Sequence, residues 1–299
     1  MYRFNTYFSK NFKKQFMKFR IALLAFFYAH LFFAQDRMPY QIFDASGKQV
    51  SFKKVLHSAQ NNEVLLFGEF HDNPIVHWLE LELIKDVAQK TELVLGAEMI
   101  ESDNQTQLNS YLNGEIDQKK LDSTARLWPN YKSDYKQLVD FAKEKKFPFV
   151  ATNIPRRYAS LVFKDGFEAL DKLPAEEKNW MAPLPILYDE NLAGYAKMRT
   201  EIAGHESNNL PKAQAVKDAT MAYFIYKNKK ENTLFIHFNG SYHSDNYEGI
   251  YWYLRKLQPN MKIITIATVT QKKVEKLEKE HYNKADFILV IDQDVTTSY

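Results

Sequence analysis

Val64-Leu65-Leu66-Phe67-Gly68-Glu69-Phe70-His71-Asp72-Asn73-Pro74 is the stretch from which the rest of the chain can be interpreted. A short apolar run ends at Gly68, and a carboxylate, an imidazole and a second carboxylate follow within four residues. Asn73-Pro74 then stops the run. The pattern predicts a buried strand over residues 64–67 that presents polar side chains at its carboxyl end.

A second stretch has the same design, far downstream. It reads Leu234-Phe235-Ile236-His237-Phe238-Asn239-Gly240-Ser241-Tyr242-His243. Here too an apolar run leads to a glycine, and a histidine stands three residues after it. Two Gly-x-x-His elements at two predicted strand ends are the main functional signal in this sequence.

Buried strands alternate with amphipathic helices along the chain, which is typical of a parallel sheet covered by helices. We therefore predict an α/β fold with a mostly parallel central sheet, helices on both faces and a helical insertion subdomain over about residues 155–230. Strands are expected at residues 64–67, 93–97, 147–151, 233–238, 263–268 and 287–291, after a small hairpin with arms at 40–44 and 49–52. Helices are expected at residues 74–90, 102–122 (as short pieces), 133–146, 247–257 and 272–281.

The N-terminus has the pattern of a secretory signal peptide over residues 1–34. Six basic residues and no acidic residue precede an apolar block at residues 21–34, which is short for a membrane span. An uncleaved anchor is the alternative, and translation could begin at Met1 or at Met17. Residues 35–299 are expected to form a single domain without a transmembrane span.

Charge and cysteine content exclude several classes of function. Removing residues 1–34 removes six positive charges and lowers the formal net charge from +3 to −3, so we expect no nucleic-acid partner. The chain has no cysteine, which excludes disulfides, thiol catalysis and the lipobox cysteine of a lipoprotein. Because of the predicted signal peptide, the expected location is outside the cytoplasm, in the periplasm or associated with the outer membrane without a lipobox cysteine.

Polar residues follow the predicted strands at the edge where an open parallel sheet binds its ligand. For the loop after the first strand, the structural alternative is simple capping of the next helix by Asp72. His237 lies inside an apolar strand and is interpreted as a core histidine. Glu98 needs a partner, which could be a salt bridge with an arginine. The candidates at this edge are Glu69, His71, Glu98, Asn153, Arg156, Arg157, Asn239 and His243.

Two histidines and two glutamates could form a metal site with an open position for water. In that interpretation His71 and His243 hold the metal, and Glu69 or Glu98 acts as general base. Arg156 and Arg157 could clamp a carboxylate or a phosphate. The spacing does not fix this chemistry, because it matches no known short catalytic motif.

Five motifs follow one another along the chain: Gly68-Glu69-Phe70-His71-Asp72-Asn73, Gly96-Ala97-Glu98-Met99, Asn153-Ile154-Pro155-Arg156, Gln214 with residues 217–222, and Gly240-x-x-His243. Taken in this order, they resemble the ChaN-like haem-binding uptake family of the Tiki/TraB/erythromycin esterase superfamily. The resemblance spans about residues 40–292. Gly-Ser-Tyr-His differs from the Gly-x-Gly-His form that is common in the haem-binding branch.

The resemblance implies an exported protein that binds haem in iron uptake and forms a homodimer in which two haems stack. It also implies an alternative, since Tiki relatives are metal-dependent proteases that use the paired Gly-x-x-His elements and a glutamate. In this chain those residues are His71, His243 and Glu69 or Glu98, with Mn, Co or Zn as the metal. The haem ligand is expected in the helical insertion, among Tyr158, Tyr188, Tyr195 and His205.

Three functions therefore remain open from the sequence. The first is haem binding, at the strand ends and the helical insertion, with Asn153, Arg156, Arg157, Tyr158 and His205 as ligand-binding residues. The second is metal-dependent hydrolysis, so the sequence leaves open whether the protein is an enzyme. The third is a non-catalytic interaction module whose polar edge is structural.

Overall fold

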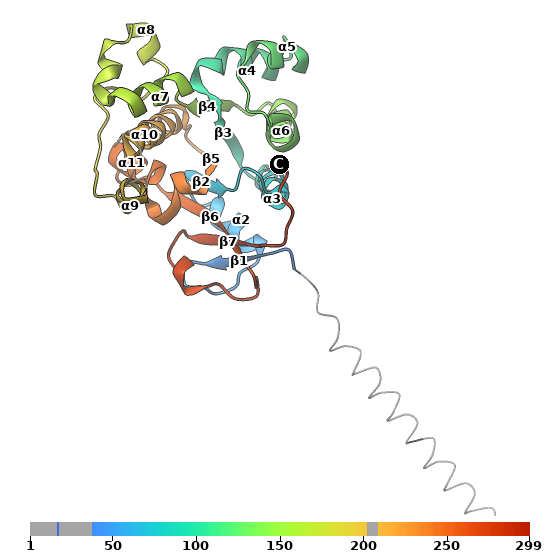
Figure 1. The fold of residues 1–299 in the computed structure, drawn as a ribbon. Coiled ribbons are helices and arrows are strands. Elements are labelled where there is room, and N and C mark those ends of the chain that lie inside the picture. Colours follow the sequence, from blue (N-terminus) through green and yellow to red (C-terminus); the bar gives the residue numbers. More distant parts are fainter. Residues whose placement is uncertain (1–16, 18–37, 202–208) are drawn as a thin grey trace, which may run out of the picture. The chain divides into compact units, whose positions relative to one another are not determined.

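Seven strands form one sheet in the order β1-β7-β6-β2-β5-β3-β4 (Figure 1). Every neighbouring pair is parallel except β1 and β7, which are antiparallel. The prediction of a mostly parallel α/β sheet is therefore confirmed. The strands are β1 (Tyr40–Asp44), β2 (Val64–Glu69), β3 (Glu92–Glu101), β4 (Phe149–Asn153), β5 (Thr233–Gly240), β6 (Ile263–Gln271) and β7 (Phe287–Asp292).

The computed structural model describes Met17, residues 38–201 and residues 209–299. The predicted signal peptide, except Met17, and His205 lie outside the described residues. Within the part that is described, no helix has both the length and the apolar character needed to span a bilayer.

Helices fill the connections between the strands. The α-helices are α2 (Phe52–Ala59), α3 (Pro74–Val87), α4 (Gln105–Leu112), α5 (Gln118–Thr124), α6 (Lys136–Lys145), α7 (Arg156–Asp165), α8 (Ala175–Lys178), α9 (Ala193–Glu201), α10 (Leu210–Asn228) and α11 (Ile250–Leu257). Shorter helical turns are η1 (Ser102–Asn104), η2 (Tyr131–Tyr135), η3 (Phe167–Lys172), η4 (Ser241–His243), η5 (Asp245–Tyr247) and η6 (Lys279–His281). As predicted, the described residues between β4 and β5 contain helices and no strand.

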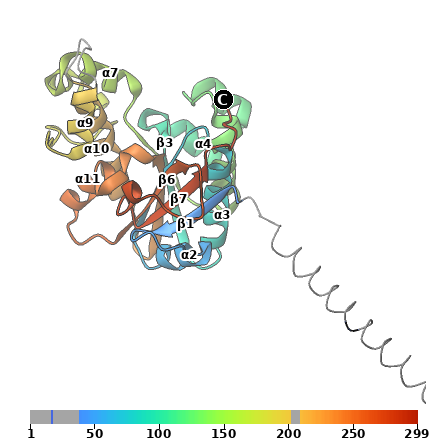
Figure 2. The same ribbon diagram turned by 60° about the horizontal axis from the view of Figure 1, so that its bottom comes forward.

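Both faces of the sheet are covered by apolar packing. Leu65 and Phe67 of β2 join a core with side chains of α3, α4 and α6, whereas Val64 and Leu66 join a second core with side chains of α7, α10 and α11. Figures 1 and 2 show the two groups of helices on opposite sides of the strands. Because alternate residues of a strand point to opposite faces, a strand buried on both faces reads as a continuous apolar run.

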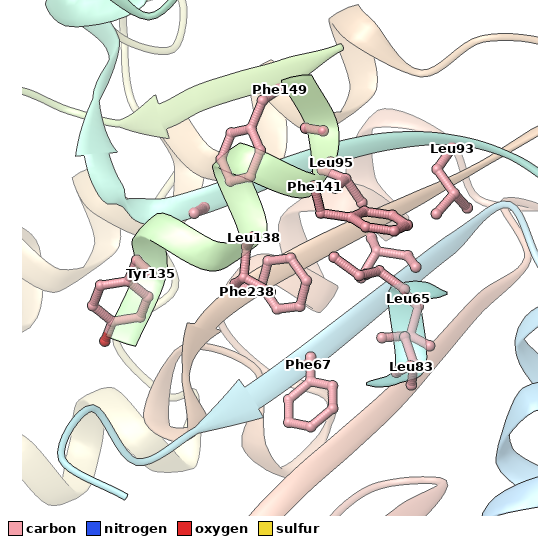
Figure 3. Close-up of a cluster of buried hydrophobic side chains, with 14 of the residues drawn as sticks. Leu65, Phe67, Leu83, Leu93, Leu95, Tyr135, Leu138, Phe141, Phe149 and Phe238 are labelled. Atoms are coloured by element: carbon pink, nitrogen blue, oxygen red, sulfur yellow. The ribbon is translucent and has the colours of Figure 1, made fainter. Parts of the chain in front are cut away.

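The core on the α3 and α6 side is rich in aromatic rings, among them Phe67, Phe149 and Phe238 (Figure 3). Tyr135 lies at the edge of this cluster, and its hydroxyl points away from the apolar side chains (Figure 3). Much of the unusually high aromatic content therefore serves packing, while Tyr135 turns a polar atom toward the carboxyl end of β2.

The two Gly-x-x-His strand ends are neighbours in the sheet. Strand β2 pairs with β5 in a register that places Glu69 opposite Gly240. The chain passes from β2 to β3 in one direction across the sheet and from β5 to β6 in the other. The carboxyl ends of β2 and β5 therefore form a topological switch point, where open α/β sheets bind their ligands.

Asn73 caps helix α3, which follows β2. Its side-chain oxygen accepts hydrogen bonds from the backbone N–H groups of Ile75 (3.1 Å) and Val76 (3.2 Å), and Pro74 occupies the first turn. Pro74 suits this position because the first helical N–H groups have no partner within the helix.

We expect Asn73→Ala to lower the free energy of unfolding by about 1 kcal/mol, because the substitution leaves two backbone donors of α3 without their acceptor. Urea denaturation followed by circular dichroism measures the change. Asn73→Asp keeps an acceptor oxygen and is the matched control. Equal losses in both variants would contradict the capping role.

Two local predictions were wrong. Residues 272–281 do not form a helix, because the Gln271 side chain ties the segment into a compact loop. Its amide donates to the carbonyls of Lys273 and Lys276 and accepts from the N–H of Glu278, at 3.0 Å each. The second arm of the predicted hairpin is reduced to a single antiparallel bridge between Gln49 and Phe43. Strand β1 pairs with β7 instead, and helix α2, which was not predicted, begins at Phe52.

Candidate functional site

Glu69 and His71 lie at the end of β2, as predicted. Glu69 is buried, and its Oε1 accepts hydrogen bonds from His71 Nδ1 (2.7 Å) and from the hydroxyl of Tyr135 (2.9 Å). Burial alone would raise the pKa of Glu69, but the neighbouring imidazoles of His71 and His77 lower it to about 2. Glu69 is therefore an ionised carboxylate that orients the imidazole of His71.

Glu98 and His243 form a second acid–imidazole pair. His243 Nε2 lies 3.1 Å from Glu98 Oε1, and the N–H of Gly240 donates to Glu98 Oε2 at 2.8 Å. Burial opposes ionisation of Glu98, but the charge of His243 holds the pKa of this carboxyl far below its usual range. The partner of Glu98 is thus a histidine and not Arg156 or Arg157, whose salt bridge with Glu98 was the structural alternative to a functional role.

Helix α10 contributes a carboxylate to His243 from the other side. Asp218 Oδ1 pairs closely with His243 Nδ1, and Asp218 Oδ2 accepts a hydrogen bond from the Tyr195 hydroxyl at 2.6 Å. Burial alone would lower the pKa of His243, but the charges of Glu98 and Asp218 raise it to about 9. His243 is consequently a buried imidazolium between two acids.

Helix α3 supplies a third histidine that sequence reasoning missed. His77 Nδ1 lies 3.0 Å from Glu80 Oε2 and 3.2 Å from Glu69 Oε2, and its Nε2 donates to the carbonyl of His71 at 3.1 Å. Burial opposes protonation, but the neighbouring carboxylates of Glu69 and Glu80 raise the pKa of His77 to about 11. The spacing of His77 and Glu80, one helical turn apart, was the available signal.

His71 is the most exposed of the three histidines in these acid–imidazole pairs. His71 is about one-third exposed at its side chain, its Nδ1 is held by Glu69, and its Nε2 makes no hydrogen bond to any described residue. Burial works against protonation, yet the hydrogen bond with Glu69 and the charge of Glu98 raise the pKa of His71. The arrangement can donate a proton or orient a polar ligand.

Gly240 is required for this geometry. A Cβ atom at this position would lie 2.9 Å from His71 Nε2 and 3.6 Å from Glu98 Oε2. Any side chain would therefore displace the imidazole. The glycine of the second Gly-x-x-His element thus makes room for the histidine of the first.

The predicted ligand-binding residues at β4 lie apart from the histidine site. Asn153 ends β4, and Arg156, Arg157 and Tyr158 follow it. No described hydrogen bond or ion pair joins these residues to His71, His77 or His243. Asn153 is buried, and its Oδ1 has no hydrogen-bond partner. Arg156 is exposed. Arg157 pairs with Asp103 at 2.6 Å and lies over the rings of Tyr158 and Trp180.

The tyrosines proposed as haem ligands differ in availability. Tyr158 and Tyr195 are buried, and their hydroxyls donate to Glu177 and Asp218. Tyr188 is partly buried against Tyr195 and Phe167, and its hydroxyl makes no hydrogen bond to any described residue. His237 is fully buried, and burial lowers its pKa to about 4, which agrees with the interpretation as a core histidine.

Residues 55–254, about two thirds of the chain, match the family described as haem-binding uptake, Tiki superfamily, ChaN. The chain belongs to this family. The ChaN match includes both Gly-x-x-His elements, Glu98 and the α10 residue Asp218. The acid–imidazole row, which consists of His71, His77, His243 and the carboxylates paired with them, therefore lies within the matched region.

Two known proteins illustrate the relationship. The solved structure of ChaN from Campylobacter jejuni, titled as cofacial heme binding, superposes with a TM-score of 0.63 at 18% identity, covering 84% of this chain and 96% of that one. Among curated proteins, Protein RETICULATA-RELATED 5, chloroplastic, from Arabidopsis thaliana is 23% identical over 214 residues, which are 64% of this chain. The chain spans only 29% of that relative's length.

Two groups of three potential metal ligands occur among the described residues of this ChaN-family chain. One is the buried set Glu69, His77 and Glu80, and the other is Glu278, Glu280 and His281 near the surface. His71 and His243 belong to neither group. The role of these two histidines as metal ligands therefore stays a prediction.

Proposed function

We propose that this protein binds haem as part of iron uptake and that the haem contacts the helical insertion next to the acid–imidazole row. The observation that carries the proposal is the match of residues 55–254 to the haem-binding uptake family. ChaN of C. jejuni, which has a similar fold, binds haem cofacially.

Tyr188 fits the role of axial ligand to the haem iron better than the other tyrosines considered. A phenolate oxygen can hold haem iron, but the oxygen must be free of other partners. The hydroxyls of Tyr158 and Tyr195 are already bound to carboxylates, whereas that of Tyr188 is not. Although burial raises the pKa of Tyr188, the positive charge of Arg199 acts in the opposite direction. Leu187, next to Tyr188, is 54% exposed and offers an apolar contact for the macrocycle.

Arg156 is the arginine that we assign to a haem propionate. It is exposed and forms no ion pair with a described residue, whereas Arg157 is held by Asp103. A guanidinium binds a carboxylate through two parallel hydrogen bonds. Asn153 and His205 complete the set of ligand-binding residues that we propose.

Titration of the purified protein with hemin tests the proposal. We expect a shifted Soret band that saturates at a fixed stoichiometry, and a Tyr188→Phe variant that binds hemin at least about tenfold more weakly, because it lacks the phenolate ligand. Tyr158→Phe is the matched control, since the hydroxyl of Tyr158 is committed to Glu177.

The titration has two contradicting outcomes with different meanings. A flat absorbance titration of the wild-type protein would exclude haem binding. Equal affinities of the wild-type protein and Tyr188→Phe would exclude Tyr188 and leave the iron to another residue. The resting spectrum of protein expressed with haem available gives an independent check.

We further propose export through the predicted signal peptide and a homodimer that forms around stacked haems. Sedimentation velocity with and without hemin measures the dimer. A monomer that persists in saturating hemin would contradict it.

Metal-dependent hydrolysis is a second proposal, favoured by one specific observation. Ionisable groups with strongly shifted pKa values cluster at the switch point, and such clusters are enriched at catalytic sites. His71 Nε2 lies next to Gly240 without a hydrogen-bond partner among the described residues, Glu69 holds Nδ1, and Glu98 accepts from the N–H of Gly240. Loss of hydrolysis in both His71→Ala and His243→Ala would support this function, whereas unchanged rates would remove it.

A further inference from the structure

Three ligand-type side chains converge beneath the loop that carries His71. Glu69 comes from the end of β2, and His77 and Glu80 come from the first turns of α3. All three are buried, with exposed fractions of 1%, 2% and 0%. One donor atom from each lies within 4.8 Å of the other two.

The spacing of the donor atoms suits a small cation. His77 Nδ1 is 3.2 Å from Glu69 Oε2 and 3.0 Å from Glu80 Oε2. Two ligand atoms bound about 2.1 Å from one ion are about 3.0 to 3.4 Å apart at octahedral or tetrahedral angles. The three side chains therefore need little movement to close around an ion.

Surrounding contacts fix the donors as they are fixed in metal sites. The His77 Nε2–H donates to the carbonyl of His71 at 3.1 Å, which leaves Nδ1 as the nitrogen that can carry a lone pair. The Tyr135 hydroxyl and His71 hold Glu69 Oε1, while Glu69 Oε2 faces His77 without a hydrogen bond. Glu80 Oε1 also has no hydrogen-bond partner although it is buried.

Two buried carboxyl groups share one imidazole in this cluster. Burial and the charge of Glu69 raise the pKa of Glu80 well above its usual value, so a proton is favoured on this carboxyl when no ion is bound, and a cation would replace it. A divalent cation with a neutral imidazole would give two positive charges against two negative ones. Glu69 Oε2, which is buried and has no hydrogen-bond partner, is an atom that such an ion would engage.

We propose that Glu69, His77 and Glu80 form a binding site for a first-row divalent cation. One imidazole and two carboxylates suit Zn²⁺, Mn²⁺ or Fe²⁺. This site is distinct from the paired His71 and His243, and it goes beyond haem binding. Because Glu69 also holds His71, the cation would fix the histidine that faces the ligand.

Zn²⁺ is the probe, measured by competition with a chromophoric chelator on the purified protein freed of metal. We expect one tightly bound equivalent and at least about a 100-fold weaker affinity in Glu80→Gln, which loses a charged ligand at almost unchanged volume. Glu82→Gln removes a partly exposed carboxylate from the same helix and should bind Zn²⁺ as the wild-type protein does.

His243→Ala separates the proposed site from the paired-histidine site. The site on α3 is supported if His243→Ala still binds one equivalent of Zn²⁺ and Glu80→Gln does not. It is overturned if Glu80→Gln keeps the bound Zn²⁺ and His243→Ala loses it. Absence of Zn²⁺ binding by the wild-type protein at about 10 µM, or equal affinities of the wild-type protein and Glu80→Gln, also overturns it.

Thermal unfolding gives a second readout that does not depend on the chelator. Zn²⁺ should raise the Tm of the wild-type protein and of Glu82→Gln, because a ligand bound only by the folded state stabilises it. The Tm of folded Glu80→Gln should stay unchanged, and an equal rise would contradict the site. Hemin titration of Glu80→Gln reports haem binding separately, so failure of the cation site and failure of the proposed function are distinguishable.

Discussion

Glu98→Gln is expected to lower the free energy of unfolding by about 3 to 5 kcal/mol, the cost of removing one partner from a buried ion pair. Both oxygens of Glu98 face donors, with His243 on Oε1 and the Gly240 N–H on Oε2. A glutamine has one acceptor oxygen, so its NH₂ group must meet either a backbone N–H or an imidazolium. Urea denaturation at pH 7 measures the loss.

Glu101→Gln is the matched control, because Glu101 lies on the same strand and is also buried. The ion-pair partner of Glu101 is the more exposed Arg126, at 3.7 Å, and burial raises the pKa of Glu101. Replacing the Glu101 carboxylate by a neutral amide should therefore lower the free energy of unfolding by less than about 1 kcal/mol, which is the range for exposed ion pairs. Similar losses in both variants would show that His243 does not need the charge of Glu98.

Stability should fall as the pH rises from about 6.5 to about 9. In this interval the folded protein keeps protons on His77 and His243, whose pKa values are about 11 and about 9, while an unfolded histidine titrates near 6.5. The folded state then binds more protons than the unfolded state, so each histidine lowers the free energy of unfolding by about 1.4 kcal/mol per pH unit. The contribution is complete below pH 6.5, and that of His243 is lost above pH 9.

Denaturation curves collected with a chelator between pH 6 and pH 9 measure this slope. His243→Gln should remove about 1.4 kcal/mol per pH unit from it, because one of the two protons is no longer retained. His57→Gln changes an exposed histidine of α2 and should leave the slope as it is. A slope that survives in His243→Gln would mean that the imidazole is neutral in the folded state.

Most of the sheet could be predicted from the sequence because parallel strands buried on both faces are continuous apolar runs. Strands β2, β3 and β5 are of this kind. Residues 272–281 could not be assigned correctly, since their charged, periodic composition fits a helix. The side chain of Gln271 supplies hydrogen bonds that replace those of the helix.

The location of the site could also be predicted, because Gly-x-x-His elements at strand ends are local patterns. His77 and Glu80 were missed because the buried face of α3 was predicted from its apolar residues alone. In the structure, this face carries His77 and Glu80 beside Val76 and Leu83. An apolar pattern in the sequence does not reveal polar residues on the buried face of a helix. His77 and Glu80 are therefore identified only by their contacts with Glu69 in the structure.

The order of the strands has a consequence for synthesis of the chain. Val64 of β2 pairs with Phe235 of β5 and with Ile263 of β6, which are 171 and 199 residues downstream. On the ribosome, neither edge of the largely apolar strand β2 can pair until most of the polypeptide has been made. Pairing over such distances is slow, and unpaired edges promote aggregation. We therefore expect the nascent chain to be prone to aggregation until β5 and β6 have been synthesised.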